Sequence, residues 1–305
     1  MTLTQLSYVV ALAEKGHFGR AAEACNISQP TLSAQIQKLE QELGAVLFDR
    51  SFQPVRTTEH GERFVNQARA VLAERDHLVS LLDVDGDLVG ELRVGIIPTL
   101  STYLLPIVMP AFAEQFPQVE LSVQELTTSS LMERIVSREL DAGLVATVER
   151  RPGVDVAPLF REAFVAYVSD NHQLAAASSL HASDLVDVPL WLLTEGHCLR
   201  DQVLELCERA EGPCEIGDYR VRFESGNLET LRHMVDRLGG ITLLPQLSTY
   251  FLDPTSMRRV RTFDAPAPYR QISLVSRRAG AKRRMIEAFS GVIIHTMSDI
   301  VGHDA

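Results

Sequence analysis

Apolar residues recur at helical spacing in the first 44 residues of the chain, where they predict three short helices. The first helix is indicated by one apolar face: Leu3, Leu6, Val9, Val10 and Ala13. The second covers about residues 18–25, and a turn at residues 26–28 follows it. Ser28 is a good N-cap for the third helix, and Pro30 suits its first turn. The apolar face of this helix is Leu32, Ile36, Leu39 and Leu43. This order predicts a helix-turn-helix.

The exposed face of the third helix carries short polar side chains and no acid between Ser28 and Lys38. The whole chain has a formal net charge of −11, so any contact with DNA requires a local surface and cannot rely on overall charge. Hydroxyl and amide groups suit base edges and phosphates in a major groove, although a merely solvated helix is the alternative. The expected DNA contacts are Ser28, Gln29, Pro30, Thr31, Ser33, Gln35 and Lys38. Residues 47–50 and 54–57 predict a two-stranded wing, in which Arg50 and Arg56 would contact phosphates.

A long helix is predicted from residue 58 to about residue 84. Its apolar residues recur in a heptad-like pattern: Phe64, Ala68, Val71, Leu72, Leu78 and Leu81. The acid-rich break at residues 83–87 follows directly, which favours a dimerisation arm with a hinge after it. An amphipathic helix packed in the core of one chain is the alternative.

After residue 90 the pattern changes to alternating strands and helices. Strands are predicted at residues 92–97, 119–126, 142–146, 163–168, 190–193 and 241–244, and helices at residues 102–116 and 129–136. Such alternation predicts an α/β fold with parallel sheets and helices on both faces. The length of this region suits two α/β lobes, joined by crossing strands near residues 161–168 and 264–272.

Cys198 follows the turn Glu195-Gly196, and apolar residues then return at helical spacing: Leu199, Val203, Leu204 and Leu206. Cys198 therefore lies near the first turn of a helix, where free N–H groups, the helix dipole, His197 and Arg200 favour a thiolate. Lowering the thiol pKa raises the fraction of thiolate but makes that thiolate a weaker nucleophile, so the rate of its reaction with an oxidant rises only a few-fold. A fast oxidant sensor would also need donors for the charge that leaves on the oxidant.

Cys207 lies nine residues beyond Cys198. In one unbroken helix this separation is roughly 13–14 Å, whereas a disulfide requires Cα atoms within about 7 Å. A redox pair at these positions would therefore have to unwind the helix. The alternative is that both cysteines are small hydrophobic residues in a core helix.

Polar residues follow several predicted strands at the carboxyl ends where ligands bind in open α/β sheets. They lie at residues 98–101, 127–129, 196–198 and 225–227. Thr99 and Thr128 could hold a small polar molecule against the sulfur of Cys198 and supply the required donors. The alternative is that they only cap their helices.

Composition narrows the class of protein. With 305 residues and 46% hydrophobic content, the chain can bury the cores of two or more domains. The start has no basic segment leading into an apolar core, and no apolar run reaches membrane-spanning length, so we expect a cytoplasmic protein. The four cysteines form neither a disulfide framework nor a zinc spacing, and no metal or cofactor is expected.

The motifs at residues 28–33, 39–44, 47–50 and 58–61 together resemble those of the LysR family of bacterial regulators. The resemblance implies a winged helix-turn-helix at residues 1–58 and a linker helix with its hinge at 59–89. It implies a two-lobed, periplasmic-binding-protein-like α/β effector domain at 90–305, with lobe I at about 90–161 and 268–305 and lobe II at about 162–267. Such regulators act as homodimers that usually assemble into homotetramers on DNA.

Residues 196–202, Cys207, 227–235 and 240–245 resemble the peroxide-sensing members of that family. The resemblance implies that Cys198 reacts with peroxide and that Cys207 resolves it into a disulfide. It also implies a peroxide pocket formed by Thr99, Thr128, His197, Arg200 and Asp201. The loop after Cys207 is longer than expected and contains Cys214, an alternative resolving thiol or an uninvolved one. The wing at residues 51–54 is poorer in basic residues than the family suggests, and Cys25 is most simply a packed small residue.

The expected function is thus that of a transcription regulator, not an enzyme, which switches oxidative-stress genes when hydrogen peroxide oxidises Cys198. Its expected partners are promoter DNA in the nucleoid, RNA polymerase, and a thiol reductant such as the glutaredoxin or thioredoxin system. One alternative is a LysR-type regulator gated by a small metabolite between the lobes, with passive cysteines. Another is a thiol peroxidase, which would turn over many peroxides per protein.

Overall fold

The computed structural model describes residues 1–80, 88–147, 150–186, 188–194, 198–206, 214–216, 219–221, 226–278 and 282–301. The chain forms two compact units, the first mainly Met1–Gly86 and the second mainly Asp87–Val136, Leu140–Arg278 and Arg284–Ala305. No helix in the described ranges is both long enough and apolar enough to cross a membrane.

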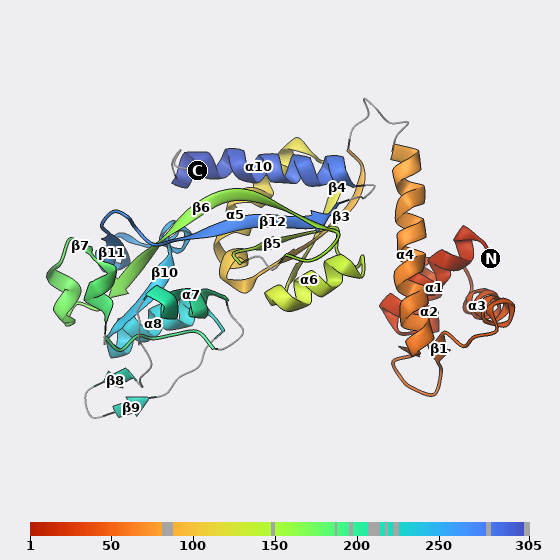
Figure 1. The fold of residues 1–305 in the computed structure, drawn as a ribbon, viewed down its shortest axis with the longest axis horizontal. Coiled ribbons are helices and arrows are strands. Elements are labelled where there is room, and N and C mark those ends of the chain that lie inside the picture. The colour runs from red at the N-terminus through yellow and green to blue at the C-terminus, as the bar shows by residue number, and fades with distance from the viewer. Residues whose placement is uncertain are drawn as a thin grey trace. The chain divides into compact units, whose positions relative to one another are not determined.

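The first unit is a winged helix-turn-helix followed by a long helix (Figure 1). Its elements are α1 (Leu3–Lys15), α2 (Phe18–Ala24), α3 (Gln29–Leu43), β1 (Phe48–Asp49), β2 (Arg56–Thr57) and α4 (Glu59–Ser80). Thr2 and Gln5 form a capping box at the start of α1, and Gly44, in the left-handed region, ends α3. The elements before α4 are called the head below. The predicted helix-turn-helix and wing are thus confirmed.

The core of the head differs slightly from the predicted apolar faces. Leu12 is fully buried in α1, whereas Leu3 at its start and Leu43 at the end of α3 are exposed. Both exposed leucines lie at helix ends, beyond the contact between the helices. The core, which Val65 of α4 completes, consists of Val9, Leu12, Ala21, Ala22, Leu32, Ile36, Leu39, Leu47, Phe48 and Val65.

Gly61 fixes the head to α4. A Cβ atom at this position would lie 1.9 Å from the backbone oxygen of Leu47, so only glycine fits. Thr58 completes the joint, because its hydroxyl donates to the Val46 carbonyl at 2.8 Å and accepts from the Gly61 N–H at 2.9 Å. The base of the wing and the first turn of α4 therefore form one rigid joint.

The second unit has two lobes. Lobe I contains the elements β3 (Gly90–Ile96), α5 (Pro98–Gln115), β4 (Val119–Glu125), α6 (Thr128–Val136), β5 (Ala142–Val145) and α10 (Arg283–Val301). Lobe II contains η1 (Gln173–Ala176), β7 (Ser179–Leu180), η2 (Ala182–Leu185), α7 (Cys198–Leu206), β8 (Cys214–Ile216), β9 (Tyr219–Val221), α8 (Leu228–Leu238), β10 (Ile241–Pro245), η3 (Gln246–Thr249), α9 (Pro254–Met257) and β11 (Val260–Phe263).

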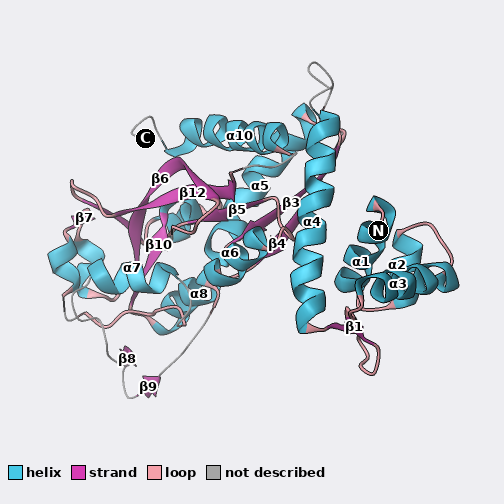
Figure 2. Ribbon diagram, turned by 45° about the vertical axis from the view of Figure 1, so that its right-hand side comes forward, coloured by secondary structure: helices cyan, strands magenta, loops and turns pink. Residues whose placement is uncertain are grey.

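Two long strands, β6 (Val154–Val168) and β12 (Tyr269–Arg277), run side by side between the lobes (Figure 2). The sheet order is β4-β3-β5-β12-β6-β11-β7, with β10 also paired to β6. Only β3, β4 and β5 pair in parallel within lobe I, while β12 and β10 are antiparallel to β6. The predicted α/β fold is confirmed, and the predicted parallel pairing holds for β3 with β4 and β5 and for β7 with β11. It was wrong for β6, whose partners β10, β11 and β12 are antiparallel to it. β12 returns between the lobes and must therefore run opposite to β6.

The strand predicted at residues 190–193 is also absent. Trp191 forms an isolated parallel bridge to Thr242, its N–H donates to the Ile241 carbonyl at 2.9 Å, and side chains add to this backbone contact. The Trp191 indole N–H donates to the Gly239 carbonyl at 2.9 Å, and the Thr242 hydroxyl donates to the Trp191 carbonyl at 2.8 Å. The apolar run marks burial here rather than a strand.

Candidate functional site

Thr99 lies in the first turn of α5, directly after β3, and is 3% exposed. Ile97 is the N-cap of this helix and supplies no side-chain cap. The Thr99 hydroxyl oxygen instead accepts a hydrogen bond from Arg270 Nη1 at 3.1 Å, and its carbonyl accepts one from Arg270 Nη2 at 3.1 Å. Both oxygen atoms of Thr99 therefore accept hydrogen bonds from the buried Arg270 side chain, and Thr99 does not act as a helix cap.

Arg270 is in turn paired with Glu162, and both side chains are essentially fully buried. The two residues face each other in register on β12 and β6, and Arg270 Nε donates to Glu162 Oε2 at 2.8 Å. Sequence reasoning missed this pair. The available signal was a charge of each sign within an apolar strand, but the partners are 108 positions apart and several other arginines compete.

Cys198 is the first residue of α7, so its backbone lies at the helix N-terminus as predicted. Leu199 and Val203 bury the apolar side of this helix. Arg200 Nη1 donates to the Leu193 carbonyl at 3.2 Å, which ties the first turn back to the preceding segment. Asp201 is exposed, and His197 and Cys207 lie outside the described residues.

Gln202, one turn after Cys198, connects α7 to lobe I. Its amide nitrogen donates to the Ala146 carbonyl at 3.2 Å and lies 3.3 Å from the Thr147 hydroxyl, directly after β5. Since β5 and β3 are parallel neighbours, α7 lies at the same edge of the sheet from which α5 and Thr99 emerge. Gln202 was not among the predicted site residues, although it belongs to the segment 196–202 that carries the resemblance to peroxide-sensing regulators.

Thr128 is the first residue of α6 and is half-buried. Its neighbour Thr127 accepts a hydrogen bond from the Ser130 N–H at 3.4 Å, which is the capping interaction of this helix. The Leu126 N–H donates to the Ile96 carbonyl at 2.9 Å, so the ends of β3 and β4 lie together. Thr99 and Thr128 therefore emerge from neighbouring strand ends.

The residues predicted to contact DNA occupy the start and outer side of α3. Ser28 is the N-cap, and its hydroxyl accepts from the Thr31 N–H at 3.3 Å. Gln29, Pro30, Thr31 and Lys38 are exposed, whereas Ser33 and Gln35 are half-buried. Gln35 also accepts from the Gln5 side-chain amide at 3.3 Å, so one end of it is engaged within the head.

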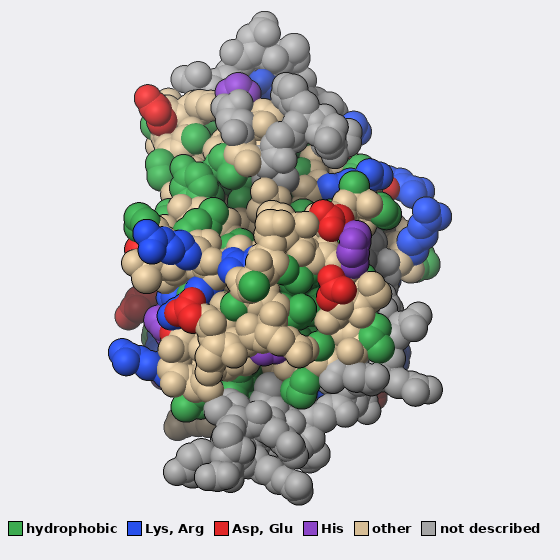
Figure 3. Space-filling model, turned by 90° about the vertical axis from the view of Figure 1, so that its left-hand side faces the viewer, with side chains coloured by type: hydrophobic (Ala, Val, Ile, Leu, Met, Phe, Trp, Pro, Cys, Tyr) green, Lys and Arg blue, Asp and Glu red, His purple; other side chains and the backbone are tan. Residues whose placement is uncertain are grey.

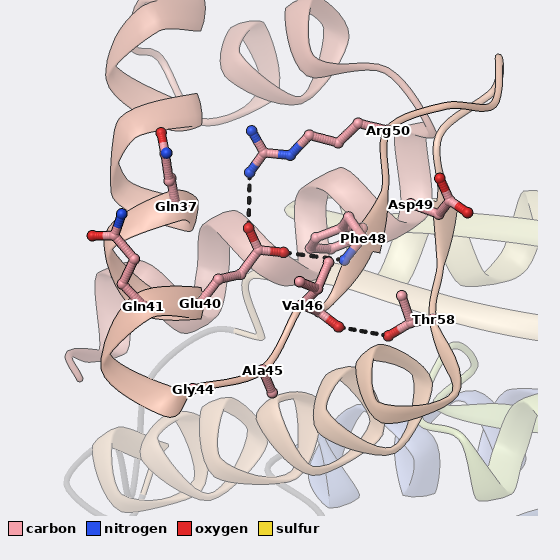
Figure 4. Close-up of a pocket in the computed structure, with 10 residues that line it drawn as sticks. All are labelled: Gln37, Glu40, Gln41, Gly44, Ala45, Val46, Phe48, Asp49, Arg50 and Thr58. Atoms are coloured by element: carbon pink, nitrogen blue, oxygen red, sulfur yellow. Dashed lines mark hydrogen bonds and ion pairs between the residues drawn. The ribbon is translucent and has the colours of Figure 1, made fainter.

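Each wing arginine lies over an aromatic ring. Arg50 is 5.3 Å from the centre of the Phe18 ring and pairs with Glu40 at 2.8 Å, whereas Arg56 is 4.7 Å from the centre of the Phe52 ring. A hollow of about 700 Å³ lies between α3 and the wing. Figure 4 shows the guanidinium of Arg50 pointing toward the carboxylate of Glu40. Glu40 also accepts from the Leu47 and Phe48 N–H groups, so this carboxylate joins α3 to the wing.

The end of the effector unit seen in Figure 3 has basic, acidic and hydrophobic side chains interspersed on its surface.

Two families match the chain. The LysR substrate binding domain matches residues 85–298, and the bacterial regulatory helix-turn-helix protein, lysR family, matches residues 3–62. The hydrogen peroxide-inducible genes activator of Haemophilus influenzae is 37% identical over 99% of both chains. The DNA-binding transcriptional dual regulator OxyR of Escherichia coli is 37% identical over 96% of this chain and 95% of its own.

Solved structures show the same relationship. A full-length OxyR variant from Pseudomonas aeruginosa has a TM-score of 0.82 and 38% identity, covering 96% of this chain and 94% of its own. A hydrogen-peroxide-bound OxyR variant from Corynebacterium glutamicum has a TM-score of 0.64 and 31% identity, covering 98% and 95%. The chain therefore belongs to the LysR family of DNA-binding transcriptional regulators and is similar along its whole length to the peroxide-responsive OxyR members.

Proposed function

We propose that this LysR-type regulator senses hydrogen peroxide through Cys198. The thiolate sulfur attacks one peroxide oxygen, an S–O bond forms, and the O–O bond breaks. Hydroxide leaves with the bonding electron pair and takes up a proton to become water. The sulfenic acid then condenses with the Cys207 thiol, releasing a second water and leaving a disulfide.

The observation that carries this proposal is the position of Cys198 at the first residue of α7, a helix bonded to the strand end beside Thr99. Free N–H groups at a helix start stabilise a thiolate. The neighbouring threonines supply hydroxyl donors for the leaving oxygen. The peroxide pocket proposed here consists of Thr99, Thr128, His197, Arg200 and Asp201.

Disulfide formation would have to dismantle α7, because an unbroken helix that reached position 207 would separate the Cα atoms of the two cysteines by roughly 13–14 Å, whereas a disulfide requires about 7 Å or less. Leu199 and Val203 would lose their packing, and Gln202 would lose its bonds to residues 146 and 147. Oxidation would thereby alter how lobe II contacts lobe I, and we propose that this change reaches the DNA-binding heads.

The test is titration of the reduced protein with stoichiometric peroxide, followed by thiol mapping with mass spectrometry. Wild type should form the 198–207 disulfide, and Cys207→Ser should stop at the sulfenic acid. Cys25→Ser is the matched control and should behave as wild type. A Cys198→Ser variant that still responds to peroxide in a promoter assay would end the proposal.

A metabolite bound between the lobes is the second candidate, because the matched effector family is described as a substrate binding domain. A metabolite should raise the melting temperature of protein whose thiols have been blocked by alkylation. Peroxide should have no effect on the same sample. A rise in the melting temperature of the alkylated protein on adding a metabolite would therefore support this second candidate over the peroxide sensor.

We propose that residues 1–58 bind promoter DNA, residues 59–89 dimerise, and residues 90–305 sense the signal. Val71 and Leu78 are exposed apolar residues seven positions apart on α4, which supports a helix that pairs with a second copy. Homotetramers on nucleoid DNA, contact with RNA polymerase, and reduction by a glutaredoxin or thioredoxin system complete the proposal.

A further inference from the structure

Glu162 is a fully buried carboxylate for which the sequence suggested no role. Its Oε1 accepts from the Leu247 N–H at 2.9 Å, and its Oε2 accepts from Arg270 Nε at 2.8 Å. The same Oε2 lies 2.8 Å from Arg270 Nη2. Glu162 lies on β6, so its carboxylate connects this strand to β12 and to η3.

The pairing with Glu162 decides where the guanidinium of Arg270 points. A guanidinium has five donors in a fixed plane, and Glu162 engages the edge that contains Nε. The remaining donors on Nη1 and Nη2 are left to Thr99, whose hydroxyl and carbonyl oxygens they reach at 3.1 Å each. The carboxylate also compensates a cation that is costly to bury alone.

The orientation of Arg270 in turn decides where the Thr99 proton points. A guanidinium can donate but cannot accept, so the Thr99 oxygen must be the acceptor in this contact. Its own proton is then directed away from Arg270. Among the described residues this hydroxyl donates to no other group. It can therefore donate to a molecule bound at the end of β3.

We propose that Glu162 is a positioning residue for peroxide reduction at Cys198, an inference that rests on the proposed function. As the sulfur forms its bond to one peroxide oxygen, negative charge develops on the other, which leaves as hydroxide. A Thr99 hydroxyl fixed as a donor stabilises that charge. Glu162 orients Arg270, Arg270 fixes Thr99, and Glu162 itself touches neither the sulfur nor the peroxide.

Glutamine at position 162 tests this role because it keeps the size of the side chain but has a single acceptor oxygen. It can serve Leu247 or Arg270, and not both. The readout compares two reactions of Cys198 in a Cys207→Ser background. Sulfenic acid formation with hydrogen peroxide needs the donor for leaving hydroxide, whereas alkylation by iodoacetamide needs only the thiolate.

The expected result for Glu162→Gln is a peroxide rate constant lower by about tenfold or more, with alkylation changed far less. Thr99→Val should show the same split. The double variant should react with peroxide no more slowly than Thr99→Val alone, because both changes remove the same donor. Glu120→Gln, an exposed acid on β4, is the control and should change neither rate.

Equal loss of both rates in Glu162→Gln, no loss, or losses that multiply in the double variant would overturn the role of Glu162. A wild-type Cys198 that ignores peroxide would instead refute the proposed function. Should Glu162→Gln fail to fold, Glu162→Asp retains the buried charge but shortens its reach to Arg270. It should lower the peroxide rate selectively, and an unchanged ratio of the two rates would overturn the inference.

Discussion

Arg50 in the head is oriented before any DNA is present. Glu40 holds one side of its guanidinium, and the ring of Phe18 lies beneath it. The side chain nevertheless remains 39% exposed, so part of its donor edge faces solvent. Pairing and stacking together reduce the conformational entropy that a phosphate contact would otherwise cost.

Replacing Arg50 with alanine should therefore weaken DNA binding similarly for all sequences. A lost phosphate contact should also reduce the slope of log affinity against log salt by about 1. Titration of promoter DNA at several salt concentrations measures both effects. Arg63→Ala, which removes an exposed arginine paired with Glu59 on α4, is the control. An unchanged slope for Arg50→Ala would show that its charge is used only within the head.

The reactivity of Cys25 should depend on pH in a way that tests how its surroundings affect its thiol. Burial, and secondarily the negative charge of Glu14, raises the pKa of its thiol. A raised thiol pKa means less thiolate at any pH below it. Alkylation of Cys25 should therefore be slow at neutral pH and should rise about tenfold per pH unit until the pH passes that pKa. Glu14→Gln should speed the reaction near neutral pH, and an equal rate in both proteins would contradict the electrostatic cause.

The positions of some residues could be predicted from the sequence, whereas the contacts of others could not. Ser28 and Cys198 could be placed at helix starts because capping and apolar spacing are local properties. Glu162 and Arg270 could not be paired, because their contact depends on the register of two strands that only the folded sheet defines. The positions of Thr99 and Thr128 after predicted strands suggested that they could bind a small polar molecule, and the resemblance assigned them to a peroxide pocket. The sequence alone could not indicate that Arg270 donates hydrogen bonds to Thr99.

At the scale of elements, the first turn of α3 combines a helix cap with a proposed contact to DNA. Ser28 caps the helix, and its hydroxyl also lies 2.8 Å from that of Thr31 on the surface proposed to enter the major groove. A cap contributes about 1 kcal/mol, and aspartate caps as well as serine does. A substitution that keeps the cap but adds a negative charge can therefore distinguish the effect of Ser28 on helix stability from its effect on DNA binding.

Ser28→Ala should lower the free energy of unfolding by about 1 kcal/mol. Ser28→Asp should keep that stability but weaken DNA binding strongly, since a carboxylate would face phosphates. Thermal unfolding and DNA titration measure the two properties on the same samples. If Ser28→Asp binds DNA as wild type does, the start of α3 lies away from the duplex.

Elements differed in how far the sequence could predict them. α3 and β10 have strong local signals, namely a cap with an apolar stripe in α3 and a short, mostly apolar and fully buried run in β10. The first half of β6 has no regular alternation of buried and exposed residues, so its length was not predicted. The pairing of β6 with β12 holds that half in place, which no periodicity within either segment could reveal.

For the whole molecule, the exposed apolar residues of α4 carry the prediction about assembly. Leu78 is 60% exposed and Val71 is 40% exposed on a helix whose Val65 and Ala68 are buried. A monomer gains nothing from this arrangement, whereas two such helices could bury the exposed side chains against each other. Sequence periodicity predicted the arm, but the partner copy is a property of the assembly.

Leu78→Glu should therefore lower the association constant of the dimer, because it places a charge in an apolar helix pair. Sedimentation equilibrium across a range of concentrations measures the shift. Met257→Glu, which changes an exposed apolar residue on α9, is the control and should leave association unchanged. A Leu78→Glu protein that associates as wild type does would place the dimer contact elsewhere.

The close approach of Gly61 to Leu47 leaves the recognition surface no freedom to swivel on its supporting helix. In a dimer, the distance between two such surfaces would then be a fixed length, and an operator would have to match it. Inserting about five base pairs between the two halves of an operator would turn one half to the opposite side of the duplex and abolish simultaneous binding. Gly61, where any side chain would be too large, would thus determine how much variation in operator length this regulator tolerates.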